Sequence, residues 1–291
     1  MPVPIRACAP ARLGAGRGSK RFRPARPTLL CFPAVSSSPP SSRPRTAFLP
    51  AAGLGSRLGP LTAETPKALL PVGGETLLTR AMTHAAEAGI RRFLVTTHLH
   101  PEAFTAHFPD GTWRGLPVEL VHEPYRLETG GGLRNLAGRL GPEPLLLSNP
   151  DTVTDAPLEK LFAAHAAASG ERLVTLGTLP GGPEPHVLAD SVGRVRALGP
   201  ATGDAPAFRG GQRHTYLGLS VVEPAFLAYL RPGVRESVVA GWRRALTDRP
   251  AAVALCPLTP CRWEDAGTLA AYERLRPAGL AAARAWPGEP A

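Results

Sequence analysis

Residues 46–67 read TAFLPAAGLGSRLGPLTAETPK, an apolar stretch that runs directly into a glycine-rich loop. The loop glycines are Gly53, Gly55 and Gly59. Glycines that follow a strand let the backbone approach a ligand closely and direct N–H groups at phosphate oxygens. Arg57 and Lys67 add two cations, which suit the negative charge of a triphosphate. The stretch therefore predicts a first strand that ends in a phosphate-binding loop.

Two other kinds of phosphate loop do not fit this pattern. A P-loop requires Lys and then Ser or Thr after its last glycine, whereas Gly59 is followed by Pro60. A dinucleotide-binding loop requires the spacing GxGxxG, whereas this chain has GxGxxxG, and Pro60 prevents the usual helix start. A dinucleotide-dependent oxidoreductase is accordingly disfavoured.

Apolar strands and amphipathic helices alternate from residue 46 to about residue 178. The expected strands are 46–52, 92–97, 118–121, 144–148 and 172–176, and the expected helices are 76–88, 101–108, 130–140 and 158–168. This alternation predicts an α/β fold with a parallel sheet that is covered on both faces. Beyond Pro180 the expected strands lack crossover helices, which predicts a small antiparallel extension. These later strands are 186–189, 194–198, 215–222 and 251–255, and a helix at 269–275 follows them.

Charge is distributed unevenly along the 291 residues, which carry a formal net charge of +10. Residues 1–45 contain nine of the 33 basic residues and no acidic one, so the rest of the chain has 24 basic and 23 acidic residues. A nearly neutral body excludes a nucleic-acid-binding surface outside that segment. No apolar run reaches the roughly 18 residues that a transmembrane helix needs, so we expect no membrane contact and a cytoplasmic protein.

Composition also divides the chain into three parts. Residues 1–45 are rich in Pro, Arg and Ser, which predicts a disordered basic tail. An organelle-targeting segment and a start codon assigned too far upstream are the alternative explanations of this tail. One domain is expected over 46–278, and residues 279–291 are expected to form a C-terminal tail. The four cysteines lack the spacing of a metal site, so free thiols are favoured over a disulfide between Cys256 and Cys261.

Two aspartates that are far apart in the sequence are candidate metal ligands. Asp151 follows the apolar run LLLS (145–148), and the carboxyl end of a parallel strand is where α/β sheets bind ligands. Asp265 lies in the sequence RWEDAGT (262–268). Mg²⁺ prefers oxygen ligands and typically takes one or two carboxylates together with substrate phosphates. The two aspartates therefore predict a magnesium site, provided that folding brings them together beside the glycine-rich loop.

The segment LETGGG (127–132) precedes an expected helix. Thr129 is the expected N-cap of that helix, and the N–H groups at its start are expected to bind an acceptor. A flexible glycine turn is the alternative that the residues alone leave open.

Taken together, these segments resemble those of a known enzyme family. The string AAGxGxRLxPLTxxxPKxLLPVxG, which begins at Ala51, resembles the signature loop of nucleoside-diphosphate-sugar pyrophosphorylases. The resemblance covers residues 46–278 and includes LETGGG, the aspartate of a Gly-Asp motif at Asp151 and a Trp-x-Asp-x-Gly-Thr motif at Asp265. Within this family, the chain is most similar to uridylyltransferases acting on N-acetylmuramate 1-phosphate and to guanylyltransferases acting on mannose 1-phosphate.

The resemblance implies a Rossmann-like nucleotidyltransferase fold and a defined reaction. A nucleotidyl group from UTP or GTP would pass to a sugar 1-phosphate with the help of Mg²⁺, and pyrophosphate would be released. The implied catalytic residues are Arg57, Lys67 and Asp151, and the implied metal ligands are Asp151 and Asp265. The implied nucleotide-binding residues are Ala51, Ala52, Gly53, Leu54, Gly55, Ser56, Arg57, Lys67, Glu128, Thr129 and Gly130. Asn149 and Thr215 are the implied sugar-binding residues, and we expect a monomer or a homodimer.

Two positions depart from the pattern of the family. Pro150 stands where the family has glycine before the metal-binding aspartate, and proline removes an N–H group and fixes φ. Gly59 stands where the family often has a basic residue, so one cationic contact is absent. Both departures favour an alternative from a different class, a non-catalytic domain of the same fold that senses a nucleotide or a sugar.

Overall fold

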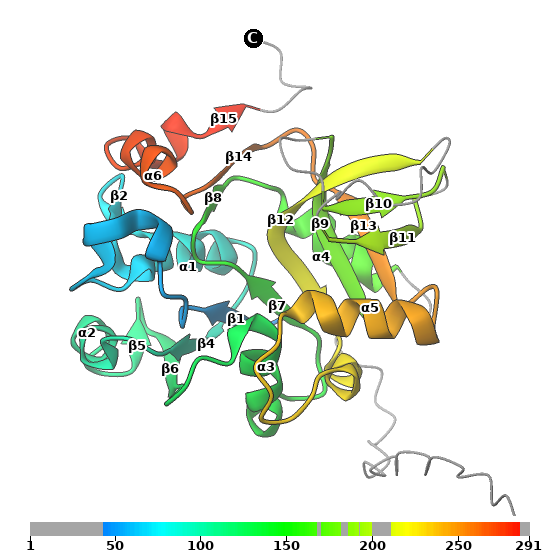
Figure 1. Cartoon of the computed structure of the whole chain (residues 1–291), viewed down its shortest axis with the longest axis horizontal. Helices are drawn as coiled ribbons and strands as arrows, with labels where there is room; N and C mark the ends of the chain where they lie inside the picture. Colours follow the sequence, from blue (N-terminus) through cyan, green and yellow to red (C-terminus); the bar gives the residue numbers. More distant parts are fainter. Residues whose placement is uncertain (1–42, 168–169, 182–185, 192, 200–210, 286–291) are drawn as a thin grey trace, which may run out of the picture. The chain divides into compact units, whose positions relative to one another are not determined.

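The computed structural model describes residues 43–167, 170–181, 186–191, 193–199 and 211–285 (Figure 1). At its centre, four strands run parallel in the order β7-β1-β4-β6. These strands are β1 (Thr46–Pro50), β4 (Arg92–Thr97), β6 (Leu116–His122) and β7 (Leu145–Ser148). The predicted α/β fold with a mostly parallel sheet is confirmed. Pro50 is the last residue of β1, which is a position where a missing N–H group costs little.

Helices cover both faces of this sheet, as the alternating pattern predicts. Successive strand residues point to opposite faces, so Ala47 and Leu49 pack on one side and Phe48 on the other. The first side is covered by α1 (Leu77–Glu87) and α4 (Leu158–Ala166), and the second by α3 (Glu128–Asn135) and α5 (Val238–Asp248). Each large apolar side chain buried in these layers contributes roughly 1.5–3 kcal/mol. Two hydrophobic cores, one on each face, therefore hold the sheet in place.

The antiparallel extension is built around the long strand β12 (Gln212–Val222). Its C-terminal half pairs antiparallel with β7, and the register of its pairing with β9 (Val174–Pro180) shifts between Tyr216 and Ser220. The extension is completed by β10 (Val187–Ala189), β11 (Val195–Leu198) and β13 (Val253–Pro257). The expected antiparallel extension is confirmed, with one correction. The strand expected at 172–176 was assigned to the parallel sheet, but the corresponding strand β9 pairs antiparallel with β12, which lies between β7 and β9.

A second, three-stranded sheet lies in the order β15-β14-β8. Its strands are β8 (Thr152–Thr154), β14 (Arg262–Asp265) and β15 (Arg284–Ala285). Helix α6 (Leu269–Leu275) matches its expected range. The C-terminal boundary of the domain needs correction, because residues 279–285 form η5 (Gly279–Ala282) and β15 rather than a tail. Our expectations for residues 1–42 and 286–291 lie outside the described residues.

The remaining elements have between two and seven residues each. They are β2 (Pro71–Val72), β3 (Glu75–Thr76), β5 (Thr112–Trp113), α2 (Pro101–His107), η1 (Ser56–Thr62), η2 (Lys67–Leu69), η3 (Ala137–Arg139) and η4 (Pro224–Tyr229). The helix expected at 130–140 is split between α3 and η3. Among the described residues, no helix combines the length and the apolar character that crossing a bilayer requires.

Candidate active site

The glycine-rich loop connects β1 to η1. Gly55 has φ +64°, and a Cβ atom there would lie 2.7 Å from Cγ2 of Thr62 and 3.1 Å from Cβ of Lys67. Glycine is therefore required for the loop to fold back against the segment that carries Lys67. Within the described part of the chain, the backbone N–H groups of residues 52–55 donate to no acceptor. These N–H groups remain available for the oxygens of a phosphate.

Lys67 and Asp151 form an ion pair beside this loop. Nζ of Lys67 lies 2.5 Å from Oδ2 of Asp151, and the two side chains are only 13% and 29% exposed. Partial burial reduces screening by solvent, which strengthens the attraction between the two charges. The pair brings a predicted phosphate-binding cation and a predicted metal ligand into direct contact.

Backbone pairing places the two candidate metal ligands side by side. Asp151 directly precedes β8, and Asp265 is the last residue of β14. In the antiparallel register of these strands Asp265 lies opposite Thr152, and the N–H group of Ala266 donates to the carbonyl of Asp151 at 2.9 Å. Two aspartates that are far apart in the sequence therefore meet at one edge of the small sheet.

The charges at this place act on one another. Burial, and then the negative charge of Asp151, raises the pKa of Asp265, while the positive charges of Lys67 and Arg57 oppose the rise. Arg57 comes close because residue 267 is glycine: a Cβ atom on Gly267 would lie 2.6 Å from Nη2 of Arg57. Two carboxylates and two cations thus share one site.

The two carboxylates fit a divalent cation. They offer hard oxygen donors, and their mutual repulsion would be relieved by a doubly charged ion. Among the described residues, no group of three or more His, Cys, Asp or Glu side chains is arranged to hold a metal. Phosphate oxygens of a bound substrate would therefore have to complete the coordination, as is usual for Mg²⁺.

The LETGGG segment (127–132) starts its helix earlier than the sequence predicted. The structure starts α3 at Glu128 with Leu127 in the N-cap position, so Thr129 lies inside the helix and does not cap it. The N–H groups of Gly130 and Gly131 donate to the carbonyl of Glu236 at 2.9 and 3.1 Å. Our expectation that these groups bind an external acceptor is therefore wrong for both.

Close packing explains the glycines of this segment. A Cβ atom on Gly131 would overlap the carbonyl oxygen of Val234, and one on Gly130 would lie 2.8 Å from the carbonyl oxygen of Glu236. The run of glycines lets α3 contact the backbone of residues 234–237. Glu128 has φ +61° and pairs with Arg235 at 3.0 Å.

The two predicted sugar-binding residues lie in different environments. Asn149 lines a cavity of about 820 Å³ next to the two aspartates, and its N–H group donates to the carbonyl of Gly218 at 2.8 Å. Thr215 is buried, and its hydroxyl donates to the carbonyl of Gly181 at 2.8 Å. Its neighbour Tyr216 lines the cavity instead. The structure thus brings Asn149, but not Thr215, to the cavity.

The cavity extends from the aspartates along residues that the sequence reasoning missed. It contains Arg57, Asp151 and Asp265 at one end and several residues of α5 at the other. The missed residues include Tyr216, Trp242, Arg243 and Trp263. Helix α5 was absent from the expected elements, although Ser237 caps its start and Val238, Gly241, Trp242 and Ala245 recur on its buried face at helical spacing. That spacing is the signal that could have found it.

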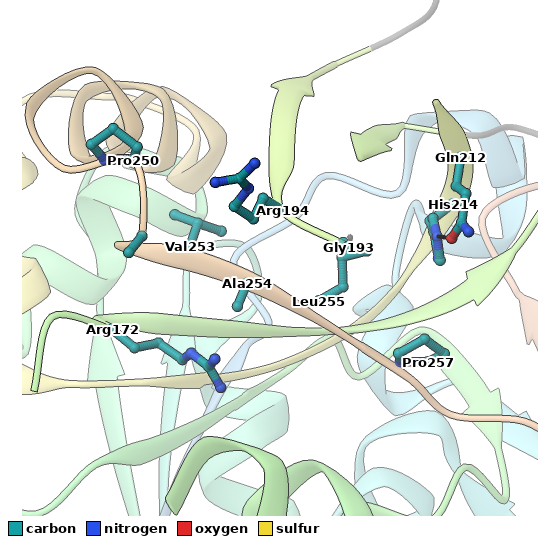
Figure 2. A pocket seen from close by; sticks show the side chains of 11 residues that line it. Arg172, Gly193, Arg194, Gln212, His214, Pro250, Val253, Ala254, Leu255 and Pro257 are labelled. Carbon is teal, nitrogen blue, oxygen red and sulfur yellow. Dashed lines mark hydrogen bonds between the residues drawn. The ribbon is translucent and has the colours of Figure 1, made fainter. Parts of the chain in front are cut away.

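A second cavity, of about 430 Å³, lies against β13 and contains none of the predicted site residues (Figure 2). Two arginines line it, and both already have partners. Arg194 pairs with Asp190 at 2.9 Å, and Arg172 donates to the carbonyl of Ala164 at 2.8 Å. The first cavity is therefore the candidate active site.

Comparison with known proteins agrees with this geometry. A protein-family model described as Nucleotidyl transferase matches residues 47–186. The chain is 40% identical to mannose-1-phosphate guanylyltransferase of Mycobacterium tuberculosis over 113 residues, which are 39% of this chain and 32% of that protein. It is 34% identical to N-acetylmuramate alpha-1-phosphate uridylyltransferase of Caulobacter vibrioides over 116 residues, which are 39% of this chain and 48% of that protein.

The matches therefore span a third to a half of these curated relatives. A solved structure, HddC from Yersinia pseudotuberculosis, superposes with a TM-score of 0.65 at 15% identity, covering 80% of this chain and 98% of that one. Identity this low supports a shared fold and nothing finer. It agrees with the mixed α/β architecture described above.

Proposed function

We propose, because residues 47–186 match a family model described as Nucleotidyl transferase, that the chain transfers a nucleotidyl group from a nucleoside triphosphate to a sugar 1-phosphate. One observation carries the proposal. Asp151, Asp265, Lys67 and Arg57 converge beside the unpaired N–H groups of the glycine-rich loop, at the end of an 820 Å³ cavity. The loop suits a triphosphate, and the cavity suits the acceptor.

The chemistry is an in-line displacement at phosphorus. An oxygen of the sugar 1-phosphate attacks the α-phosphorus, a new P–O bond forms, and the bond from the α-phosphorus to the bridging oxygen breaks. The electron pair of that bond leaves on pyrophosphate, and the product is a nucleoside diphosphate sugar. The side chains of Arg57 and Lys67 stabilise the charge on the leaving group, and no covalent bond to the protein is required.

Asp151 and Asp265 are the residues that would hold a divalent cation, and Mg²⁺ suits their oxygen donors. When bound, such an ion would neutralise charge on the reacting phosphates. Lys67 contacts Asp151 directly, so it also orients that carboxylate. Neutralisation of charge and positioning of the two substrates are the main contributions in phosphoryl transfer of this kind.

The activities named for the similar proteins supply the substrates to try first. They point to GTP with mannose 1-phosphate and to UTP with N-acetylmuramate 1-phosphate. We assign nucleobase recognition to the backbone of Ala51–Ser56 and to Glu128 and Thr129, and sugar recognition to Asn149. Gly130 and Thr215 are left out of this assignment, because the N–H group of Gly130 is bonded to Glu236 and the hydroxyl of Thr215 is bonded to Gly181.

The test is release of pyrophosphate across a matrix of nucleoside triphosphates and sugar 1-phosphates, with Mg²⁺ present. Asp151→Asn should lower turnover by about 10²- to 10³-fold without changing the melting temperature. Asp110→Asn makes the same chemical change on an exposed turn and should leave turnover unchanged. Turnover of Asp151→Asn at the wild-type rate would refute the assignment.

One observation favours a second candidate, a non-catalytic sensing domain. The carboxylate of Asp151 is already neutralised by Lys67 at 2.5 Å, and Pro150 restricts the backbone before it. A sensing domain would bind a nucleoside triphosphate or a sugar phosphate in calorimetry and release no pyrophosphate with any pair of substrates. Turnover with any pair would eliminate this candidate.

A further inference from the structure

The charged groups that line the large cavity are mostly paired with one another. At the reacting end, Asp151 and Asp265 lie with Arg57 and Lys67, as described above. On the α6 side, Glu264 accepts from Arg274 at 2.6 Å and from Arg284 at 3.3 Å. Arg243, on α5, is the exception. No carboxylate of the described residues lies within ion-pair distance of its guanidinium.

The guanidinium of Arg243 is held in a fixed position. Nε and Nη2 donate to the carbonyl of Leu198 at 2.9 and 2.6 Å. Gly199 follows directly, and a Cβ atom there would overlap Nη2, so the end of β11 fits closely around the guanidinium. Leu198 and Gly199 also line the cavity. Because two donors are anchored to one carbonyl, the remaining N–H groups form a pre-organised site for an acceptor.

Sheet order places Arg243 at the acceptor end of the cavity. The glycine-rich loop follows β1, on one side of β7, whereas β12, β10, β11 and α5 lie on the other side (Figure 1). The latter elements contribute Tyr216, Val187, Leu198 and Arg243 to the lining of the cavity. The triphosphate therefore approaches from the β1 side and the sugar 1-phosphate occupies the far side.

The far side of the cavity suits a sugar with a substituent. Tyr216 and Trp242 form an edge-to-face pair with ring centroids 5.2 Å apart, and together with Trp263 they give the cavity aromatic walls. A volume of about 820 Å³ falls in the range of pockets that hold ligands larger than a single sugar ring. There is room for a ring and for a group that reaches Arg243.

We propose, building on the proposed function, that the acceptor is a sugar 1-phosphate that carries a carboxylate, and that Arg243 binds this carboxylate. An arginine that has no acidic partner among the described residues, and whose solvent-accessible guanidinium is fixed at the wall of a cavity, is complementary to an anion. Hydrogen bonds between guanidinium and carboxylate are among the strong ones because both partners are charged. A neutral sugar would leave Arg243 with its carbonyl contact alone, so the carboxylate provides specificity.

The test compares acceptors that differ only in the acidic group. N-acetylmuramate 1-phosphate is compared with N-acetylglucosamine 1-phosphate, which lacks the lactyl ether, and glucuronate 1-phosphate is compared with glucose 1-phosphate. Pyrophosphate release by the full chain is measured at saturating UTP or GTP. The carboxylate member of at least one pair should show a kcat/KM higher by about 10- to 100-fold. Arg243→Gln should abolish this preference by raising KM for the acidic sugar by much more than KM for the neutral member.

Two control variants and a salt series distinguish the effect of the charge of Arg243 from an effect of its packing. Arg249→Gln removes an exposed arginine at the end of the same helix and should keep the preference. Arg243→Lys should keep part of it, and the preference of the wild type should shrink at high salt. If Arg243→Gln unfolds, these two measurements still decide the question.

Each remaining outcome has a defined meaning. A wild type that prefers the neutral member of both pairs, or equal losses on both members in Arg243→Gln, overturns the role of Arg243 but leaves the proposed function intact. Better turnover of glucose 1,6-bisphosphate than of either acid would also overturn it, because the bound group would then be a phosphate. No turnover with any acceptor would refute the proposed function itself.

Discussion

Strand β7 separates a side of the sheet that carries the glycine-rich loop from a side that carries the wall of the cavity. On the β1 side, strands β1, β4 and β6 are parallel neighbours, joined by residues 51–91 and 98–115. On the β12 side, the wall combines β10, β11, β12 and α5, which come from residues 187 to 248 and meet through antiparallel pairing. The first side is built largely from local sequence, and the second from pairings that only the complete fold creates.

The two sides of β7 contribute differently to substrate specificity. In the proposed reaction, phosphate binding on the β1 side depends on backbone N–H groups and on two cations, which any nucleoside triphosphate can satisfy. The wall on the β12 side depends on side chains such as Tyr216, Trp242 and Arg243. These side chains can change without disturbing the phosphate site, because no strand pairing joins the wall strands β10, β11 and β12 to the strand that precedes the loop. Acceptor choice can therefore vary while the reaction stays the same.

After Asp151→Asn, the largest expected effect comes from Lys67, the residue that joins the two sides. Lys67 lies on the β1 side and contacts Asp151, which follows β7. Lys67→Met removes a cation from the leaving group and the partner of a carboxylate, so we expect turnover to fall by about 10²-fold with a small change in stability. Pyrophosphate release and thermal unfolding measure the two quantities. Lys160→Met removes an exposed lysine on α4 and should change neither. Equal turnover in the two variants would show that the β1 side acts without Lys67.

A substitution at Gly131 should have a smaller effect, and it tests whether α3 positions the cavity wall that α5 contributes. A Cβ atom on Gly131 would overlap the carbonyl of Val234, in the segment that leads into α5. Gly131→Ala should therefore destabilise the fold by roughly 1–3 kcal/mol in urea titration and raise KM for the acceptor. Gly138→Ala is the matched control, because nothing lies within 4 Å of its added Cβ atom. If both variants are equally stable, α3 does not position the wall.

The same division explains which features the sequence revealed. Helix α1, strand β4 and the loop 51–55 follow from local periodicity and from glycines whose backbone requires them, so their prediction succeeds. The meeting of Asp151 with Asp265 depends on the pairing of β8 with β14, which local pattern does not encode; only the family resemblance suggested it. The position of β12 between β7 and β9 is likewise non-local. The glycines of LETGGG were misinterpreted. They are needed for close packing against the backbone of residues 234–237, which lies about a hundred positions later in the sequence.

The smallest expected effect lies within the β1 side and depends on pH. Glu123 follows β6 and is buried, and its Oε2 accepts from the N–H group of Leu127 at 2.8 Å. Burial raises the pKa of Glu123, although the hydrogen bond from Leu127 opposes the rise. A carboxyl group whose pKa is higher in the folded state stabilises the fold fully below its unfolded pKa. That contribution is lost as the pH rises through the folded value.

Glu123→Gln keeps an acceptor for Leu127 and removes the ionisation, so its stability relative to the wild type should increase as the pH rises above 4.5, the ordinary value of the carboxyl. Glu119 on the same strand provides a control of opposite sign. Partial burial disfavours its carboxylate, but hydrogen bonds from Arg92 and Arg139 outweigh this and lower its pKa. Glu119 therefore stabilises the fold fully above its unfolded pKa, so Glu119→Gln should lose stability relative to the wild type as the pH rises through the folded pKa towards 4.5, with no further loss above that value. Urea titrations at several pH values measure both differences, and parallel pH curves for the two variants would mean that burial does not set the charge of Glu123.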